Sequence, residues 1–113
     1  MKKMIIALFC GLVSLSAVAG GNVANGEQLA KKNGCAACHG ANFSTPIDPS
    51  YPKLAGQHAE YLEHALKAYK RGDGNNGRNN AIMGGQVKAL SNSDMADIAA
   101  YLHSLPSELV LKR

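Results

Sequence analysis

The side chains best suited to chemistry lie in residues 34–40, whose sequence is GCAACHG. Two cysteines stand three residues apart, at Cys35 and Cys38, and the imidazole of His39 follows the second cysteine directly. Three kinds of site use such a group: a redox-active dithiol, one half of a zinc site, or the covalent attachment of a haem. The rest of the chain has to decide among these three.

The zinc and dithiol interpretations lack supporting residues. A closed structural zinc site needs four ligands, usually including a second Cys or His pair downstream. The only other cysteine is Cys10, and the downstream histidines His58, His64 and His103 do not form a closely spaced pair. A thioredoxin-like dithiol needs a preceding strand and a βαβ context, whereas this sequence predicts a helix before the motif and a Pro-rich loop after it.

Cys-x-x-Cys-His is the attachment signature of a c-type haem. Positions i and i+3 of a helical turn lie on one face, so Cys35 and Cys38 can bond the two haem vinyl groups as thioethers. His39 is then carried beneath the macrocycle, where it can ligate the iron from one side. A disulfide between the cysteines would close too short a loop to add much stability. The motif therefore favours one covalently bound haem c.

A haem iron held in this way needs a second axial ligand, which is expected from further along the chain. The candidates are Met83, Met95, His58, His64 and His103. Met95 belongs to an apolar helical stripe and is expected in the core, while His58 and His64 fall on polar positions of a helix. Met83 lies in a predicted loop between paired asparagines and paired glycines, which permit close backbone approach to a flat surface. We therefore expect Met83 to be the sixth ligand.

Residues 1–19 have the features of an export signal. Lys2 and Lys3 give a positive start, residues 4–13 are almost entirely apolar, and residues 17–19 (AVA) supply a small-x-small cleavage pattern. The apolar run is shorter than the ~20 residues that a spanning helix needs. We expect cleavage to remove Cys10 and to leave one domain, residues 20–113, in the periplasm without stable membrane insertion.

Charge and composition exclude several classes of function. Without Lys2 and Lys3, ten Lys and Arg remain against eight Asp and Glu, a net charge of +2. That balance is too weak to indicate nucleic acid or an anionic membrane as a partner. The sequence contains no catalytic triad, paired carboxylate constellation or phosphate loop, so no enzymatic activity is expected. Large apolar side chains are few, and a domain of this size often needs additional core volume.

Three helices and no convincing strand are expected. The first covers about residues 25–33, with Asn22 or Asn25 as its N-cap. The second covers residues 58–71, where apolar residues recur at helical spacing and acidic side chains precede basic ones. The third begins at Ser91, which forms a capping box with Asp94, and it ends before Pro106.

Two long segments between these helices are expected to be irregular, residues 41–56 and 73–86. The first contains three prolines, and the second is dominated by Gly and Asn. Such segments are uncommon in compact domains and usually belong to a binding site. Helices joined by these loops would pack poorly on one another but could wrap around a large flat ligand.

With these elements identified, the chain resembles the class I c-type cytochromes, in particular the small monohaem proteins of the bacterial periplasm. The matching pieces cover nearly all of residues 25–106 and are NGEQLAKKNGCAACHG, YPKLAGQHAEYLEHALKAYKRG, RNNAIMGG and LSNSDMADIAAYLHSLP. The resemblance implies an all-α cytochrome c fold, with three main helices and long loops wrapped around one covalently attached haem. It also implies a close crossing of the first and last helices, where Gly26 and Leu29 would face Tyr101 and Leu102.

Three further site residues come from the same resemblance. Pro52 matches the loop proline whose carbonyl oxygen accepts a hydrogen bond from the ligating histidine, here His39. Such a bond orients the imidazole ring and raises its basicity. Lys53 and Arg78 are implied as contacts of the haem propionates, although both could equally be ordinary surface cations.

The resemblance implies a periplasmic electron carrier whose iron is ligated by His39 and Met83. Its partners would be proteins such as a quinol–cytochrome c reductase, a terminal oxidase or a periplasmic reductase. The weak net charge predicts transient docking of small area, and a monomer is expected. Two alternatives stay open: a dedicated haem subunit of one oxidoreductase complex, and a haem enzyme or gas sensor with the sixth site open.

Overall fold

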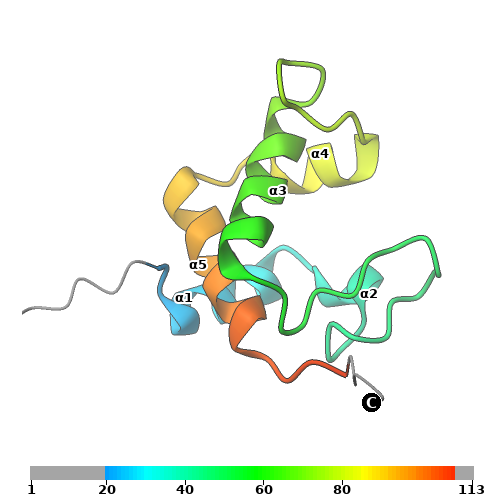
Figure 1. Cartoon of the computed structure of the whole chain (residues 1–113), viewed down its shortest axis with the longest axis vertical. Helices are drawn as coiled ribbons and strands as arrows, with labels where there is room; N and C mark the ends of the chain where they lie inside the picture. The colour runs from blue at the N-terminus through cyan, green and yellow to red at the C-terminus, as the bar shows by residue number, and fades with distance from the viewer. Residues whose placement is uncertain (1–19, 109–113) are drawn as a thin grey trace, which may run out of the picture.

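The computed structural model describes residues 20–108, and every regular element within that range is a helix (Figure 1). The helices are α1 (Val23–Lys32), α2 (Ala36–His39), α3 (Ala59–Arg71), α4 (Ala81–Val87) and α5 (Asn92–Ser104). The all-α fold expected from the sequence is confirmed. The predicted leader, residues 1–19, lies outside the described residues.

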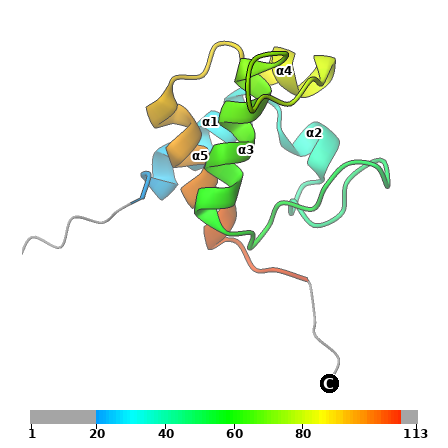
Figure 2. The same ribbon diagram turned by 45° about the horizontal axis from the view of Figure 1, so that its top comes forward.

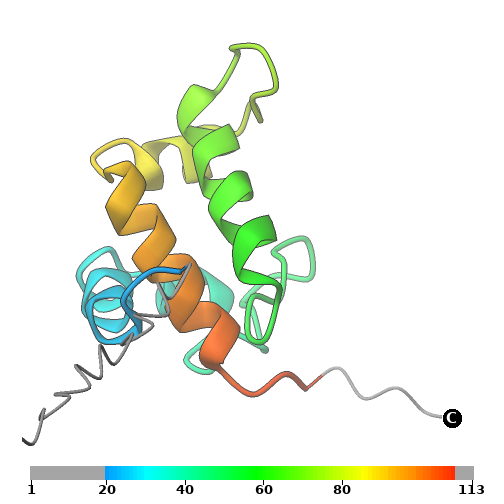
Figure 3. The ribbon, with the colours of Figure 1, turned by 60° about the vertical axis from the view of Figure 1, so that its left-hand side comes forward.

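Helices α1 and α5 cross in close contact, and Figure 3 shows α1 nearly end-on beside α5. The crossing depends on Gly26, which is buried: a Cβ atom there would lie 1.9 Å from the carbonyl oxygen of Asp97. The same atom would lie 2.9 Å from Cβ of Tyr101, so the expected contact between Gly26 and Tyr101 is confirmed. The ring of Phe43 packs edge-on against Tyr101, with a centroid distance of 6.0 Å.

A buried carboxylate joins the two crossing helices. Asp97, only 9% exposed, accepts hydrogen bonds from the backbone N–H of Asn22 at 2.7 Å and from the side-chain amide of Asn25 at 2.6 Å. Asn22 is itself the N-cap of α1 and accepts from the backbone N–H of Asn25. Asp97 therefore ties the start of α1 to the middle of α5.

We expect Asp97→Ala to lower the free energy of unfolding by at least about 3 kcal/mol, because Asp97 accepts two hydrogen bonds and each bond to a charged group contributes about 1.5–3 kcal/mol. The midpoint of urea denaturation, followed by far-UV circular dichroism, measures the loss. Glu27→Ala is the matched control, since the Glu27 carboxylate lies on α1 and pairs with the exposed Lys31 of the same helix, not with α5. Equal midpoints for the two variants would show that Asp97 does not stabilise the crossing.

Helix α5 supplies more buried residues of the core cluster than any other helix, and α3 packs beside it (Figure 2). Ser91 accepts from the backbone N–H of Asp94, and the Asp94 carboxylate accepts from the backbone N–H of Ser91, so the predicted capping box is confirmed. Met95, Ile98 and Leu102 are buried, as the apolar stripe predicted. Within the described residues, no helix combines the length and apolar character needed to cross a membrane.

The prediction that residues 73–86 are irregular is wrong for their last part, where α4 forms. Asn80 caps this helix by accepting a hydrogen bond from the backbone N–H of Met83. Its other end is anchored by Val87, which is buried in the core. Met83 therefore lies in the first turn of a short helix that packs against α3, not in a loop.

The segment between α2 and α3 is irregular, as expected, and internal hydrogen bonds give it a fixed shape. Gly40 ends α2 with a φ of 91°, and a Cβ atom there would lie 2.2 Å from the carbonyl oxygen of Thr45. The backbone N–H of Ile47 donates to the carbonyl of Cys38, which holds the loop against α2. The backbone N–H of Leu54 donates to the carbonyl of Phe43, so the loop folds back on itself.

Candidate cofactor site

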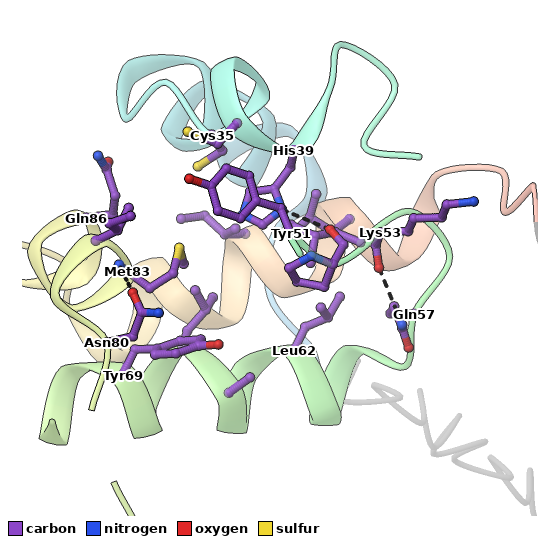
Figure 4. A pocket seen from close by; sticks show the side chains of 18 of the residues that line it. Cys35, His39, Tyr51, Lys53, Gln57, Leu62, Tyr69, Asn80, Met83 and Gln86 are labelled. Carbon is purple, nitrogen blue, oxygen red and sulfur yellow. Dashed lines mark hydrogen bonds between the residues drawn. The ribbon is translucent and has the colours of Figure 1, made fainter. Parts of the chain in front are cut away.

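A large cavity opens between α2 with its following loop and helices α3 and α4 (Figure 4). Its empty space is about 1210 Å³ when the part open to solvent is counted. Its apolar wall is formed by side chains of the loop, α3 and α5, namely Leu54, Leu62, Ala65, Leu66, Ile98 and Leu102.

The sequence motif occupies one side of this cavity. The backbone N–H of Cys35 donates to Ala30 at the end of α1, and one helical turn from Cys35 leads to His39. Cys35, Cys38 and His39 all line the cavity, and the two cysteines do not form a disulfide with each other. The predicted one-sided arrangement of the three side chains is therefore present.

The environment of Cys35 does not resemble a redox dithiol. Burial raises the pKa of the Cys35 thiol above its ordinary value. Reactive Cys-x-x-Cys motifs instead have a lowered pKa on the attacking cysteine. In the part of the chain that the structure describes, no group of three or more His, Cys, Asp or Glu side chains could hold a metal ion. The structure therefore does not support a zinc site or a redox dithiol at this motif.

The loop after α2 fixes the orientation of His39. The histidine is 7% exposed, and its Nδ1–H donates to the carbonyl oxygen of Pro52 at 3.0 Å. That bond leaves Nε2 as the nitrogen available to a metal. Tyr51 lies beside the imidazole, with ring centroids 6.3 Å apart (Figure 4). A backbone acceptor of this kind is the usual partner of a metal-ligating histidine.

Helix α4 brings Met83 to the other part of the cavity wall. Figure 4 shows its sulfur directed toward the space that His39 also faces. Met83 is partly buried and packs against the core cluster. A thioether and an imidazole that converge on one cavity, with two thiols beside them, form a donor set for a covalently attached haem with two axial ligands.

The other candidate ligands do not line this cavity. Met95 is fully buried in the core, and His58 and His64 are exposed on or next to α3. His103 is exposed as well, and its Nδ1 lies 2.7 Å from the carbonyl oxygen of Gln57. The places of Met95, His58 and His64 agree with the expectations of a core methionine and two surface histidines.

Among the described residues, two cations and no carboxylate line the cavity. Arg78 lies over two tyrosine rings of α3, with its guanidinium carbon 5.7 Å from the Tyr61 centroid and 5.3 Å from the Tyr69 centroid. Sequence reasoning did not predict this stacking, although Tyr61 and Tyr69, eight residues apart, share one helix face. Lys53 borders the cavity, but Figure 4 shows its side chain extending away from it.

Comparisons with known proteins agree with this geometry. The family model for cytochrome c matches residues 23–106. Cytochrome c-554(548) of Halomonas halodenitrificans is 45% identical over 84 residues, which cover 74% of this chain and 96% of that protein. Cytochrome c4 of Pseudomonas aeruginosa is 42% identical over 106 residues, covering 92% of this chain and 49% of its own length.

The solved structures show the same fold. The crystal structure of reduced recombinant cytochrome c4 from Pseudomonas stutzeri superimposes with a TM-score of 0.65 at 33% identity. The match covers 79% of this chain and 48% of that chain. This chain thus spans about half the length of the cytochrome c4 relatives and nearly all of cytochrome c-554(548).

An all-α fold around a cavity lined by Cys-x-x-Cys-His and a methionine defines a class I c-type cytochrome. The chain belongs to the cytochrome c family. It carries covalently bound haem c with its iron, and it is an electron-transfer protein.

Proposed function

We propose that this chain carries single electrons between respiratory partners in the periplasm, with its haem iron ligated by His39 and Met83. The observation that carries the proposal is the convergence of both side chains, from α2 and α4, on the cavity that Cys35 and Cys38 line. The haem supplies the Fe(III)/Fe(II) couple. The described geometry supports the assignment of Cys35 and Cys38 as the thioether residues.

Two side chains, His39 and Met83, would hold the haem iron. The bond from His39 to Pro52 fixes the imidazole ring, and α4 holds the Met83 sulfur. Ligation by both His39 and Met83 would leave no position on the iron for a substrate, which favours electron transfer over catalysis. A methionine sulfur as axial ligand raises the reduction potential.

Arg78 is the stronger of the two proposed propionate contacts. Its guanidinium is positioned by Tyr61 and Tyr69 at the cavity wall. Cation–π contacts of this kind contribute about 0.5–1 kcal/mol at exposed sites. Lys53 would have to rotate its side chain to reach the same ligand. The cavity lining that residues 20–108 provide contains no carboxylate, which suits the negative charge of the propionates.

We propose that residues 1–19 direct export and are removed, so that the domain of residues 20–113 acts in the periplasm as a monomer. The partners we propose are a quinol–cytochrome c reductase as donor and a terminal oxidase or periplasmic reductase as acceptor. Intact mass of the protein from a periplasmic fraction tests the leader: loss of residues 1–19 and gain of one haem are expected.

Addition of the purified protein to membranes depleted of endogenous carriers tests the role as a shuttle. We expect electron flow from quinol to oxygen to rise with the amount of protein added, while the haem cycles between its two oxidation states. If the protein instead stays bound to one oxidoreductase during purification and exchanges with no other complex, it is a dedicated haem subunit and the shuttle proposal fails.

A further inference from the structure

We propose that Asn80 is the positioning residue for Met83, setting how much of the time the Met83 sulfur stays on the iron. This inference rests on the proposed ligation by Met83. Asn80 itself touches neither iron nor substrate in the proposed mechanism. It acts through the first turn of α4.

Asn80 accepts two hydrogen bonds that flank Met83. The side-chain oxygen of Asn80 accepts from the backbone N–H of Met83 at 3.0 Å, as the dashed line in Figure 4 shows. The backbone carbonyl of Asn80 accepts from the N–H of Gly84 at 2.8 Å. The peptide groups on both sides of the methionine Cα are thereby fixed to one residue, whose own side chain also lines the cavity.

The neighbouring residues of α4 provide little other support for this turn. Ala81 and Ile82 are exposed, and Gly84 and Gly85 offer no side chain to pack. Val87 anchors the helix only at its far end. Glycine also has a lower helix propensity than every other residue except proline. The first turn therefore depends on the Asn80 cap and on the contacts of the Met83 side chain.

Loss of the cap should shift Met83 toward the detached state. Replacing an N-cap Asn by Ala costs a helix about 1 kcal/mol, at most about 2, and one to two kcal/mol corresponds to about a 5- to 30-fold change in an equilibrium. The apparent affinity of an external ligand scales with the fraction of protein whose binding position is open. We therefore expect imidazole to bind the ferric Asn80→Ala protein about 5- to 30-fold more tightly than wild type.

Imidazole titration of the ferric holoprotein, followed in the visible spectrum, tests the proposal with three variants. Asn80→Ser keeps a capping oxygen and should restore an affinity close to wild type, because Ser and Asn are similar N-caps. Ser91→Ala removes the matching cap of α5, away from the cavity, and should lower stability without changing imidazole affinity. Met83→Ala gives the imidazole affinity of a protein in which the position of the Met83 sulfur is always open.

The outcomes distinguish a wrong role for Asn80 from a wrong assignment of Met83 as the ligand. If Met83→Ala binds imidazole tightly while Asn80→Ala binds it as wild type does, Asn80 does not position the ligand. The same conclusion follows if Ser91→Ala raises the affinity as much as Asn80→Ala, because the effect would then be global loosening. If Met83→Ala binds imidazole no better than wild type, Met83 is not the ligand, and this proposal falls with that assignment.

Discussion

Met83→Ala should leave the haem covalently bound while opening its sixth position. We expect the ferric protein to lose the Met–iron charge-transfer band at the red end of the visible spectrum, and the ferrous protein to bind carbon monoxide. The reduction potential should fall, because a methionine ligand raises it and axial ligands shift haem potentials over roughly 0.8 V. Potentiometric titration and spectra of the purified variant measure these changes.

Met95→Leu is the matched control, since Met95 is the other methionine within the described residues and is fully buried in the core away from the cavity. We expect it to keep the charge-transfer band and the potential of the wild type. An unchanged potential in Met83→Ala, with carbon monoxide still excluded, would assign the sixth position to a different residue. Carbon monoxide binding to the wild type would favour the enzyme or gas-sensor alternative.

Gly26→Ala should destabilise the fold severely even though alanine is the better helix former. Helix propensity alone favours the substitution by about 0.8–1 kcal/mol. The new Cβ atom, however, would lie 1.9 Å from the carbonyl oxygen of Asp97 on α5. Backbone has to move to accept it, and overpacking costs about 1–3 kcal/mol, occasionally more. We expect a net loss near the upper end of that range.

The urea denaturation midpoint and the yield of holoprotein measure the effect. Gly85→Ala is the control: it lies in α4, outside the residues that line the cavity, and a Cβ atom there meets nothing within 4 Å. It should be neutral or slightly stabilising. A Gly26→Ala protein as stable as the wild type would show that α1 and α5 do not require close backbone contact.

Elements with local signals were predictable from the sequence. The capping box of Ser91 and Asp94 involves residues three positions apart, and the stripe of Met95, Ile98 and Leu102 has helical period, so α5 begins at the expected place. The motif of Cys35, Cys38 and His39 is similarly local. Its spacing within one turn is enough to place all three side chains on one cavity.

Features that depend on distant residues were missed. Helix α4 contains Gly84 and Gly85, which oppose helix formation, and it persists through the Asn80 cap and the burial of Val87. Asp97 bonds to Asn22 across 75 positions, which no local pattern reveals. The bond between His39 and Pro52 was expected only from the resemblance to a family. Its acceptor is a backbone carbonyl, which every residue has, so the residue type does not reveal the bond.

The most direct measurement unfolds the exported protein and extracts it with acidified organic solvent, then determines haem in both phases. We expect one haem per chain to stay with the polypeptide, and a Cys35→Ser, Cys38→Ser double variant to release it or to fail to mature. Haem that passes from the wild-type protein into the solvent, or a wild-type protein that contains none, would contradict covalent attachment at these two cysteines.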